Sequence, residues 1–400
     1  MGHQNDLIME FDIKDRWVVP KAVYVHIPFC VSKCHYCDFN SYSGMESLFD
    51  DYIHALISEI QRIPGIIGRD KLIPLNSVYI GGGTPTVLSA NQLSAVLSSI
   101  DEKIGLADDC EITLEANPGT VDEFKLDQLF AAKFNRISIG IQSFDDELLS
   151  KLGRIHTAEQ AIEVYHAARR AGFTNIGIDL MFALPGQSVK HWSKTLDKAI
   201  ELKPEHISLY ELSVEEGTQF AKLCSQDKLD LPDEEAQLDM YELAIAKLTQ
   251  AGFEHYEVSN FARPGFRSRH NQVYWRNEPH YAFGAGASSY INGTRARRIA
   301  DPRDYINAIN SSSDAIEYSE SLTGRALLAE TIALGLRVMD GIDMNKIKLQ
   351  TCADISVIYA AEIEHLQGKG LLDLIDGHLS VTHKGLLLLN NVAEEFLPGQ

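Results

Sequence analysis

The sequence predicts an α/β protein whose parallel strands are followed by a mainly helical C-terminal part. The first observation is a series of apolar runs that begins at Val23 and is rich in Ile, Val, Leu, Tyr and Phe. Near-continuous apolar runs of this kind are typical of parallel strands that are covered on both faces. The second observation is that segments with helical periodicity separate the runs, which gives successive βα units. The third is that this alternation stops after Asn260.

Each element follows from its local pattern. The predicted strands are Val23–Phe29, Ser77–Ile80, Glu111–Glu115, Arg136–Ile141, Asn175–Phe182, His206–Leu212 and Phe253–Val258. The helical segments between them are Tyr52–Arg62, Ala90–Ile100, Asp122–Lys133, Ala158–Ala171 and His191–Glu201. This series fits a closed or partly open βα barrel, and a doubly wound sheet is the competing arrangement. Periodicity alone leaves both open.

The C-terminal part has a different pattern. Residues 263–300 are rich in Arg, Gly and aromatic side chains and are expected to be irregular. Helices are expected over Gly324–Met339, Ile355–Gln367 and His383–Phe396, with a hairpin of Gly370–Leu374 and Leu379–Thr382 between the last two. Helices with a two-stranded wing are typical of a winged helix. The expected domains are therefore a polar segment 1–20, a βα barrel 21–262, a connection 263–302 and a helical, winged-helix-like domain 303–400.

Charge and hydropathy exclude several classes of function. Lys and Arg number 36 and Asp and Glu 56, so the formal net charge is −20. Phosphate backbones and anionic membranes bind mainly Lys and Arg, so nucleic acid is an unexpected partner and membrane contact at most peripheral. No apolar run is long enough to span a membrane, and the polar N-terminus has no signal-peptide core. A cytoplasmic protein is expected, and the acidic C-terminal domain is read as a packing or docking module.

Three of the six cysteines lie together in the spacing C-x3-C-x2-C. They are Cys30, Cys34 and Cys37, directly after the first predicted strand. Three thiolates on one short loop can hold three irons of a 4Fe–4S cluster and leave the fourth iron open for a substrate. The alternative is a zinc site with His26 or His35, but zinc sites usually pair C-x2-C with a second pair of ligands further on.

This cysteine motif resembles that of the radical S-adenosylmethionine (SAM) superfamily, and its flanks are similar to the oxygen-independent coproporphyrinogen III oxidase-like branch. The resemblance implies a radical SAM (βα) partial barrel, which decides the fold where periodicity does not. It also implies a 4Fe–4S cluster whose open iron is chelated by the SAM amino and carboxylate groups. Reduction of the sulfonium would then give methionine and a deoxyadenosyl radical.

Further candidate residues stand where the predicted strands end, which is where such barrels gather their ligands. Without the resemblance, each has a simpler interpretation. The glycines after the second predicted strand would form an ordinary turn, and Glu115 would be an exposed cap. Arg154 and Asp179 would form a structural ion pair. The resemblance implies that these positions bind SAM or a second SAM-like ligand; they are Tyr24, Tyr36, Gly82, Gly83, Thr84, Glu115, Gln142, Arg154 and Asp179. Tyr36 would pack on the adenine and Glu115 would bind the ribose.

A His–aromatic motif follows the predicted barrel. It contains His270, Tyr274 and Trp275 in the pattern H-N-x-x-Y-W. A histidine and two aromatics can line a flat apolar ligand, and histidine can ligate haem iron. A packed loop between two domains is the simpler interpretation. The resemblance favours haem, because this segment recurs in the HemW-type haem chaperones of the branch. Arginines 295, 297 and 298 would pair with propionates or form a solvated basic patch.

Two departures from the coproporphyrinogen dehydrogenase pattern decide the functional prediction. The dehydrogenase has a further cysteine two positions after the motif, where this chain has Phe39, and a longer segment before it. The resemblance therefore implies a haem chaperone that binds the cluster, SAM and haem and delivers haem to a respiratory acceptor protein, rather than an enzyme. The alternatives are the coproporphyrinogen III dehydrogenase and a haem-opening radical SAM methyltransferase. The acceptor, the iron ligand, SAM cleavage and the choice of monomer or dimer stay open.

Overall fold

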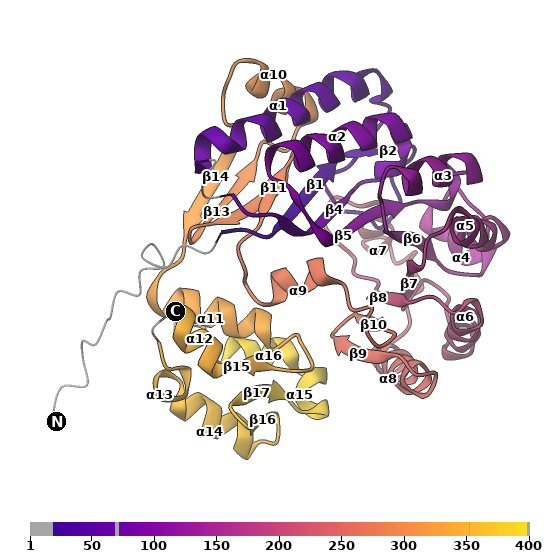
Figure 1. The fold of residues 1–400 in the computed structure, drawn as a ribbon. Helices are drawn as coiled ribbons and strands as arrows, with labels where there is room; N and C mark the ends of the chain where they lie inside the picture. Colours follow the sequence, from indigo (N-terminus) through magenta and orange to yellow (C-terminus); the bar gives the residue numbers. More distant parts are fainter. Residues whose placement is uncertain (1–18, 69–71, 352, 398–400) are drawn as a thin grey trace.

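The computed structural model describes residues 19–68, 72–351 and 353–397, and its centre is one open sheet (Figure 1). Nine strands of the described residues pair in the order β11-β1-β4-β5-β6-β7-β8-β10-β9. Their bounds are β1 (Ala22–Ile27), β4 (Leu75–Gly82), β5 (Leu106–Ala116), β6 (Arg136–Gln142), β7 (Asn175–Phe182), β8 (His206–Glu211), β9 (Glu254–Glu257), β10 (Asn260–Ala262) and β11 (Tyr281–Phe283). Within these ranges the edge strands β11 and β9 do not pair with each other, so the barrel is partial, as predicted.

The strands from β11 to β8 run parallel, and a helix follows most of them. The helices lie on the outer face of the sheet (Figure 1). They are α1 (Phe49–Ile67), α2 (Ala90–Lys103), α3 (Glu123–Ala131), α4 (Asp146–Leu152), α5 (Ala158–Ala171), α6 (Val189–Leu202), α7 (Gln219–Cys224) and α8 (Glu234–Gln250). Capping boxes start two of them, at Ser89 with Gln92 and at Thr157 with Gln160.

Short elements shape the strand ends where the candidate residues lie. The cluster loop is enclosed by β2 (Phe29–Cys30) and β3 (Tyr42–Ser43), which pair in parallel. Single 3₁₀ turns follow at η2 (Glu46–Leu48), η4 (Pro85–Val87) and η5 (Pro118–Thr120).

The last strand predicted for the barrel is paired differently from expectation. Phe253–Val258 was expected among the parallel strands, but β9 pairs antiparallel with β10. The chain reverses after Glu257, and β10 inserts between β9 and β8, again antiparallel. Three residues are too few to show a period in the sequence, which is why β10 was missed.

The expectation that residues 263–300 are irregular is wrong. They form α9 (Arg269–Trp275), β11, β12 (Ser288–Ile291) and β13 (Thr294–Arg298). Strand β11 returns to pair in parallel with β1, with Val23 opposite Tyr281. Strands β12 and β13 form an antiparallel sheet with β14 (Ile316–Ser321).

The following helix, α10 (Pro302–Asn310), contacts α1, and its Tyr305 and Ile309 belong to the main core. Residues 303–321 therefore pack with the βα part, although they were expected in the C-terminal domain. We propose that this domain begins after β14.

The C-terminal domain has a core of its own, centred on residues such as Leu328, Ile363 and Val392. Its elements are α11 (Gly324–Gly335), β15 (Ile342–Asp343), α12 (Met344–Thr351), α13 (Ile355–Ile358), α14 (Ala360–Gly368), β16 (Leu372–Ile375), β17 (His378–Val381), α15 (His383–Leu387) and α16 (Leu389–Glu394). The hairpin and α11 occur where they were predicted, but the predicted helices Ile355–Gln367 and His383–Phe396 are each divided into two. Helix α12 and β15, the third strand of the small sheet, were not predicted. No helix of the described residues is both long and apolar enough to cross a membrane.

Candidate functional site

The three clustered cysteines lie on one ordered loop beyond the carboxyl end of β1. Cys30 ends β2, and the Cys37 N–H donates to the Cys34 carbonyl over 3.2 Å. The Lys33 ammonium closes the loop by donating to the carbonyls of Phe39 (3.1 Å) and Ser41 (3.2 Å). The loop is thus held in shape by hydrogen bonds among its own residues.

Each thiol lies beside a hydrogen-bonding group. The Thr84 hydroxyl donates to Cys30 Sγ over 3.4 Å, and the Ser41 hydroxyl lies 3.8 Å from Cys37 Sγ. Arg154 Nη1 donates to Cys34 Sγ over 3.4 Å. Burial raises the pKa of Cys30 and of Cys37, so a bound metal centre has to supply the positive charge that makes these sulfurs thiolates.

The donor set fits a cluster better than a single zinc ion. Within the described ranges, no group of three His, Cys, Asp or Glu side chains could hold one metal ion. His26 is occupied by the Tyr24 hydroxyl and the Asn40 carbonyl, each 2.9 Å away, and His35 Nδ1 lies 2.8 Å from the Lys151 carbonyl. In a 4Fe–4S cluster each thiolate binds a different iron, so convergence on one point is not required.

The glycine segment after β4 lies directly against this loop. A Cβ on Gly83 would lie 2.7 Å from the Phe29 carbonyl oxygen and 3.0 Å from Cys30 Sγ. Gly82 has φ +116°, and a Cβ there would lie 2.6 Å from the His26 ring. Only glycine fits so close an approach.

Glu115 ends β5 beside this glycine segment. Its carboxylate accepts the Tyr79 hydroxyl (2.6 Å) and the Gly82 N–H (3.0 Å). Burial raises the pKa of Glu115 to about 7, and the two donors oppose that shift. The carboxylate is therefore held at a strand end with room to accept further hydroxyl donors.

The ends of β6 and β7 bring three more predicted residues together. Helix α4 stops at Gly153 in the left-handed conformation, which turns Arg154 back so that its Nη2 donates to the Gly140 carbonyl over 2.6 Å. A Cβ on Gly140 would lie 3.2 Å from Gln142 Nε2 and 3.3 Å from Arg154 Nη2. Gly140 is opposite Asp179 in the β6–β7 register.

Some polar atoms of this group have no partner in the chain. Gln142, at φ +67°, has a buried Oε1 without a hydrogen bond, and so does the Nε of Arg154. Asp179 accepts the Ser138 hydroxyl at 3.1 Å, and burial raises its pKa. Among the described residues no ion pair joins Arg154 to Asp179, so a structural pair does not explain them. Buried unpaired polar atoms are costly, and a polar ligand would satisfy them.

The two predicted tyrosines have different surroundings. Tyr36 packs against the small apolar cluster around Leu152 and Phe220. Tyr24 contacts His26 and lines a chamber of about 560 Å³ together with Gly82, Glu115 and Tyr274. That chamber also takes in Arg295, which the sequence offered as a propionate partner, and residues that the sequence did not predict to contact SAM or haem, such as His26, Phe39, Asn40, His280 and Tyr290.

The sequence contains a pattern that could have pointed to one of these chamber residues. His26 follows Tyr24 by two residues in β1, so both side chains share one face of the strand. His280 has no such pattern, because its place in the chamber comes from its pairing with Tyr290.

The H-N-x-x-Y-W motif forms α9, which lies between the sheet and α11 (Figure 1). His270 is 1% exposed, with Nδ1 3.0 Å from the Ser77 hydroxyl and Nε2 2.9 Å from the Tyr274 hydroxyl. Tyr274 faces the chamber, whereas Trp275 faces the C-terminal domain beneath Arg337. The structure brings His270 and Tyr274 together with Tyr24 but leaves Trp275 apart from them.

The three arginines of β13 are neither free nor a solvated basic patch. Arg295 pairs with Glu330 (2.9 Å), Arg297 with Glu317 (3.0 Å) and Arg298 with the buried Glu59 (2.9 Å). Their partners are distant in sequence, so the pairing could not be read from the arginines alone.

Comparison with known proteins gives one consistent relationship. Residues 24–199 match the Radical SAM superfamily, and residues 322–388 match the HemN C-terminal domain. The chain is 37% identical to Heme chaperone HemW of Bacillus subtilis, over 94% of this chain and 99% of that protein. Heme chaperone HemW of Lactococcus lactis is 39% identical, over 94% and 97%. Coproporphyrinogen III oxidase (HemN) of Escherichia coli, a radical SAM enzyme of known structure, superposes with a TM-score of 0.82 at 28% identity, over 99% of this chain and 93% of that one.

Proposed function

Since the chain belongs to the radical SAM superfamily, and within it to the family of the HemW heme chaperones, we propose that it binds haem and delivers it to a respiratory acceptor protein. The observation that carries this proposal is near full-length identity of 37% and 39% to two chaperones of that name. Phe39 supports the same choice. It is 64% exposed and lines the chamber at the position where the dehydrogenase pattern has a further cysteine.

In this proposal the radical SAM part holds a 4Fe–4S cluster on Cys30, Cys34 and Cys37. The cluster, when bound, supplies an electron that can reduce SAM. Thr84 and Arg154 hydrogen-bond two of the cysteine sulfurs, and such bonds tune the potential of a cluster. The chain's own part would be to hold three irons through these three sulfurs and to leave the fourth iron without a ligand from this loop.

SAM would bind across the strand ends. Glu115 has acceptor capacity left for two ribose hydroxyls, because its present donors use only part of it. The unpaired Gln142 Oε1 and Arg154 Nε would take up polar groups of SAM or of a second SAM-like ligand, with Asp179 beside them. Tyr36 would offer an apolar face to the adenine.

Haem would enter the chamber that Tyr24 and Tyr274 share. His270 is held in place by two hydrogen bonds, so its role in this proposal is to fix Tyr274 rather than to ligate iron. His280 also lines the chamber, and both of its ring nitrogens face carbonyls, of Glu278 at 3.2 Å and Ser288 at 3.3 Å. A neutral imidazole has one N–H, so only one of these carbonyls can accept from it, and the lone pair of the other nitrogen could bind iron only after its facing carbonyl moved away.

One anaerobic experiment tests the function. Reconstituted protein is incubated with SAM, reductant and coproporphyrinogen III, and separately with haem followed by an apo-acceptor. We expect haem binding and transfer, and no protoporphyrinogen. Formation of protoporphyrinogen would assign the dehydrogenase activity instead, and a linear tetrapyrrole made from haem would assign the methyltransferase.

Cysteine variants give the matched control. Cys34→Ala is expected to lose the cluster, whereas Cys224→Ala, which changes an exposed cysteine outside the loop, keeps it. Iron and sulfide content separate the two. Equal loss in both variants would contradict the assignment of the cluster to this loop.

A further inference from the structure

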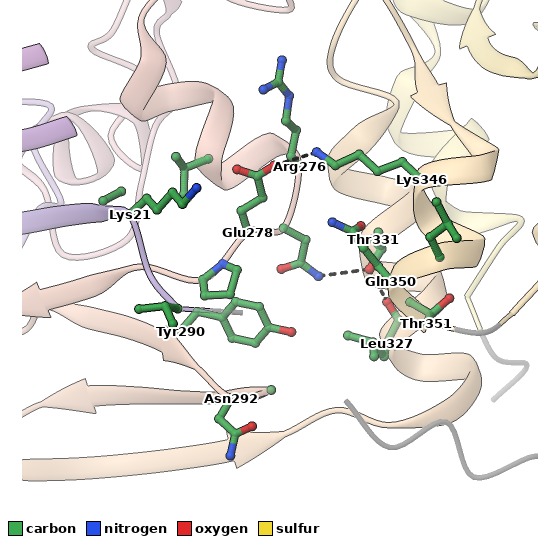
Figure 2. A pocket seen from close by; sticks show the side chains of 17 residues that line it. Lys21, Arg276, Glu278, Tyr290, Asn292, Leu327, Thr331, Lys346, Gln350 and Thr351 are labelled. Atoms are coloured by element: carbon green, nitrogen blue, oxygen red, sulfur yellow. Dashed lines mark hydrogen bonds and ion pairs between the residues drawn. The ribbon is translucent and has the colours of Figure 1, made fainter. Parts of the chain in front are cut away.

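A second pocket lies outside the chamber, between the two domains (Figure 2). Its volume is about 450 Å³. The start of β1, the end of α9 and the turn between β12 and β13 form one side, and α11 and α12 of the C-terminal domain form the other. Pockets of this size at domain interfaces commonly hold small molecules.

The lining combines an apolar floor with cationic sides. Val273, Tyr290 and Leu327 supply apolar surface, and Leu349, 72% exposed, stands at the rim. Figure 2 shows Lys21 and Lys346 approaching from opposite sides, with Glu278 between them. Such a lining suits a ligand with a large apolar body and carboxylates at its edge.

The two lysines are not equally engaged. Lys346 pairs with Glu278 at 2.7 Å. No carboxylate pairs with Lys21 in the part of the chain that the structure describes. Arg276 also lines the pocket, and among the described residues it has no carboxylate partner either, whereas Lys346 could exchange Glu278 for a ligand carboxylate. Cationic side chains that line one pocket are unusual on a chain with a net charge of −20.

A thin wall separates this pocket from the chamber. Asn277, Glu278 and Tyr290 line both cavities. Asn277 has φ +50°, and its Nδ2 donates to the Thr331 hydroxyl on α11 at 3.1 Å. The wall is therefore tied to the C-terminal domain, so a shift of α11 would move the wall.

The described residues of the outer pocket are suited to bind a porphyrin ring and its carboxylates rather than an iron ion. The described lining contains no His, Cys or Met side chain. A tetrapyrrole there would be bound through its ring and its carboxylates, which do not depend on the metal. Metal-free and iron-loaded forms should bind alike in this pocket.

We propose that the outer pocket is a waiting site for the tetrapyrrole, in which Lys21 and Lys346 bind its propionates beside the wall of the cluster chamber. The proposal rests on the chaperone function proposed above and adds a place for haem that leaves the SAM site free. Haem held there can pass to an acceptor without crossing the cluster loop.

The test uses the reconstituted full chain with protoporphyrin IX as a fluorescent probe. The double variant Lys21→Met/Lys346→Met is expected to bind the probe roughly tenfold more weakly, because it loses two exposed charge contacts whose free energies add. Val273→Phe fills the pocket and should weaken binding as well. Lys348→Met is the matched control, because Lys348 is on the same helix but pairs with Asp354 outside the pocket.

Two ligand comparisons sharpen the test. The dimethyl ester of protoporphyrin should bind wild-type protein as weakly as the acid binds the double variant. Haem should displace the probe from the outer pocket, and laurate should not. Displacement by laurate but not by haem would assign the pocket to fatty acids and overturn the proposal.

The result that would refute this inference differs from the result that would refute the proposed function. Variants that bind the probe like wild-type protein, in a chain that still transfers haem, would refute the waiting site alone. A wild-type chain that neither binds nor transfers any tetrapyrrole would refute both.

Discussion

The guanidinium of Arg154 lies 3.4 Å from the sulfur of Cys34 and donates its other terminal nitrogen to the carbonyl of Gly140. It therefore links the cluster loop to the end of β6. A positive hydrogen-bond donor at a ligating sulfur favours the reduced, more negative cluster.

Arg154→Met is thus expected to lower the midpoint potential of the cluster while leaving its iron content unchanged, because all three cysteines remain. An anaerobic redox titration followed by electron paramagnetic resonance, without SAM, measures this. Arg170→Met removes the same charge from an exposed pair with Glu123 and serves as control. Equal potentials in the two variants would show that the contact has no electrostatic effect.

Glu115 should give the apoprotein a pH-dependent stability. Its pKa is raised to about 7, so between about pH 4.5 and 7 the folded state binds more protons than the unfolded state. The free energy of unfolding must then fall as pH rises through this window. Glu115→Gln should reduce the fall by on the order of 2 kcal/mol, as measured by urea unfolding of the apoprotein at pH 5 to 8.

Glu257 also makes the free energy of unfolding fall as pH rises, because burial raises its pKa to about 7 as well. The difference between wild type and Glu115→Gln isolates Glu115. The proposed ribose contact makes a second prediction, that the affinity of wild type for SAM weakens as pH falls from 8 to 6. An unchanged pH profile of SAM binding in the variant would argue against that contact.

Gly82→Ala should prevent normal cluster incorporation. The added methyl would lie 2.6 Å from the His26 ring, and moving this ring disturbs its 2.9 Å contact with Asn40 on the cluster loop. Gly105→Ala is the control, because Gly105 also has a positive φ (+95°) but open space around its Cβ position. It should cost about 1–3 kcal/mol in backbone strain and keep full iron and sulfide content. Full iron content in Gly82→Ala would contradict the steric argument.

The neighbouring arginines of β13 should differ greatly in their effect on stability. Arg298 and Glu59 are 9% and 8% exposed, and Tyr305 and the Gly284 N–H also donate to Glu59. Arg298→Met leaves a buried carboxylate without its cation, at a cost of about 3–5 kcal/mol.

Arg297→Met breaks only a half-exposed pair with Glu317 and should cost about 0–1 kcal/mol. Thermal and urea unfolding compare the two variants. Adding Glu59→Gln to Arg298→Met should restore part of the loss, because the unpaired charge is then gone. Similar losses for Arg297→Met and Arg298→Met would refute the role of burial.

The sequence predicted the βα part well because its signals are local. Asn175–Phe182 was predicted with the bounds that β7 has, since a continuous apolar run marks a buried strand wherever it folds. The cysteine spacing and the glycines after β4 are local too, and the structure brings them together.

What the sequence missed depends on partners that are distant along the chain. Tyr281–Phe283 is a strand only because the edge of β1 accepts it, and three residues in a glycine-rich segment show no period. The carboxylates that neutralise the β13 arginines come from α1, β14 and α11. The motif around His270 could not reveal that both imidazole nitrogens are used inside the chain, because Ser77 supplies one of the contacts.

The pairing of β11 with β1 also has a consequence for how the protein is made. Of the nine described strands of the sheet, the one that leads into the cysteine loop is translated first, yet one of its two neighbours is translated only after most of the βα part. Until then β1 has an open edge, and the chamber beside the loop lacks His280 and Tyr290. A nascent chain therefore leaves its three loop cysteines less covered until β11 is made, which is when cluster delivery and oxidative damage compete for them.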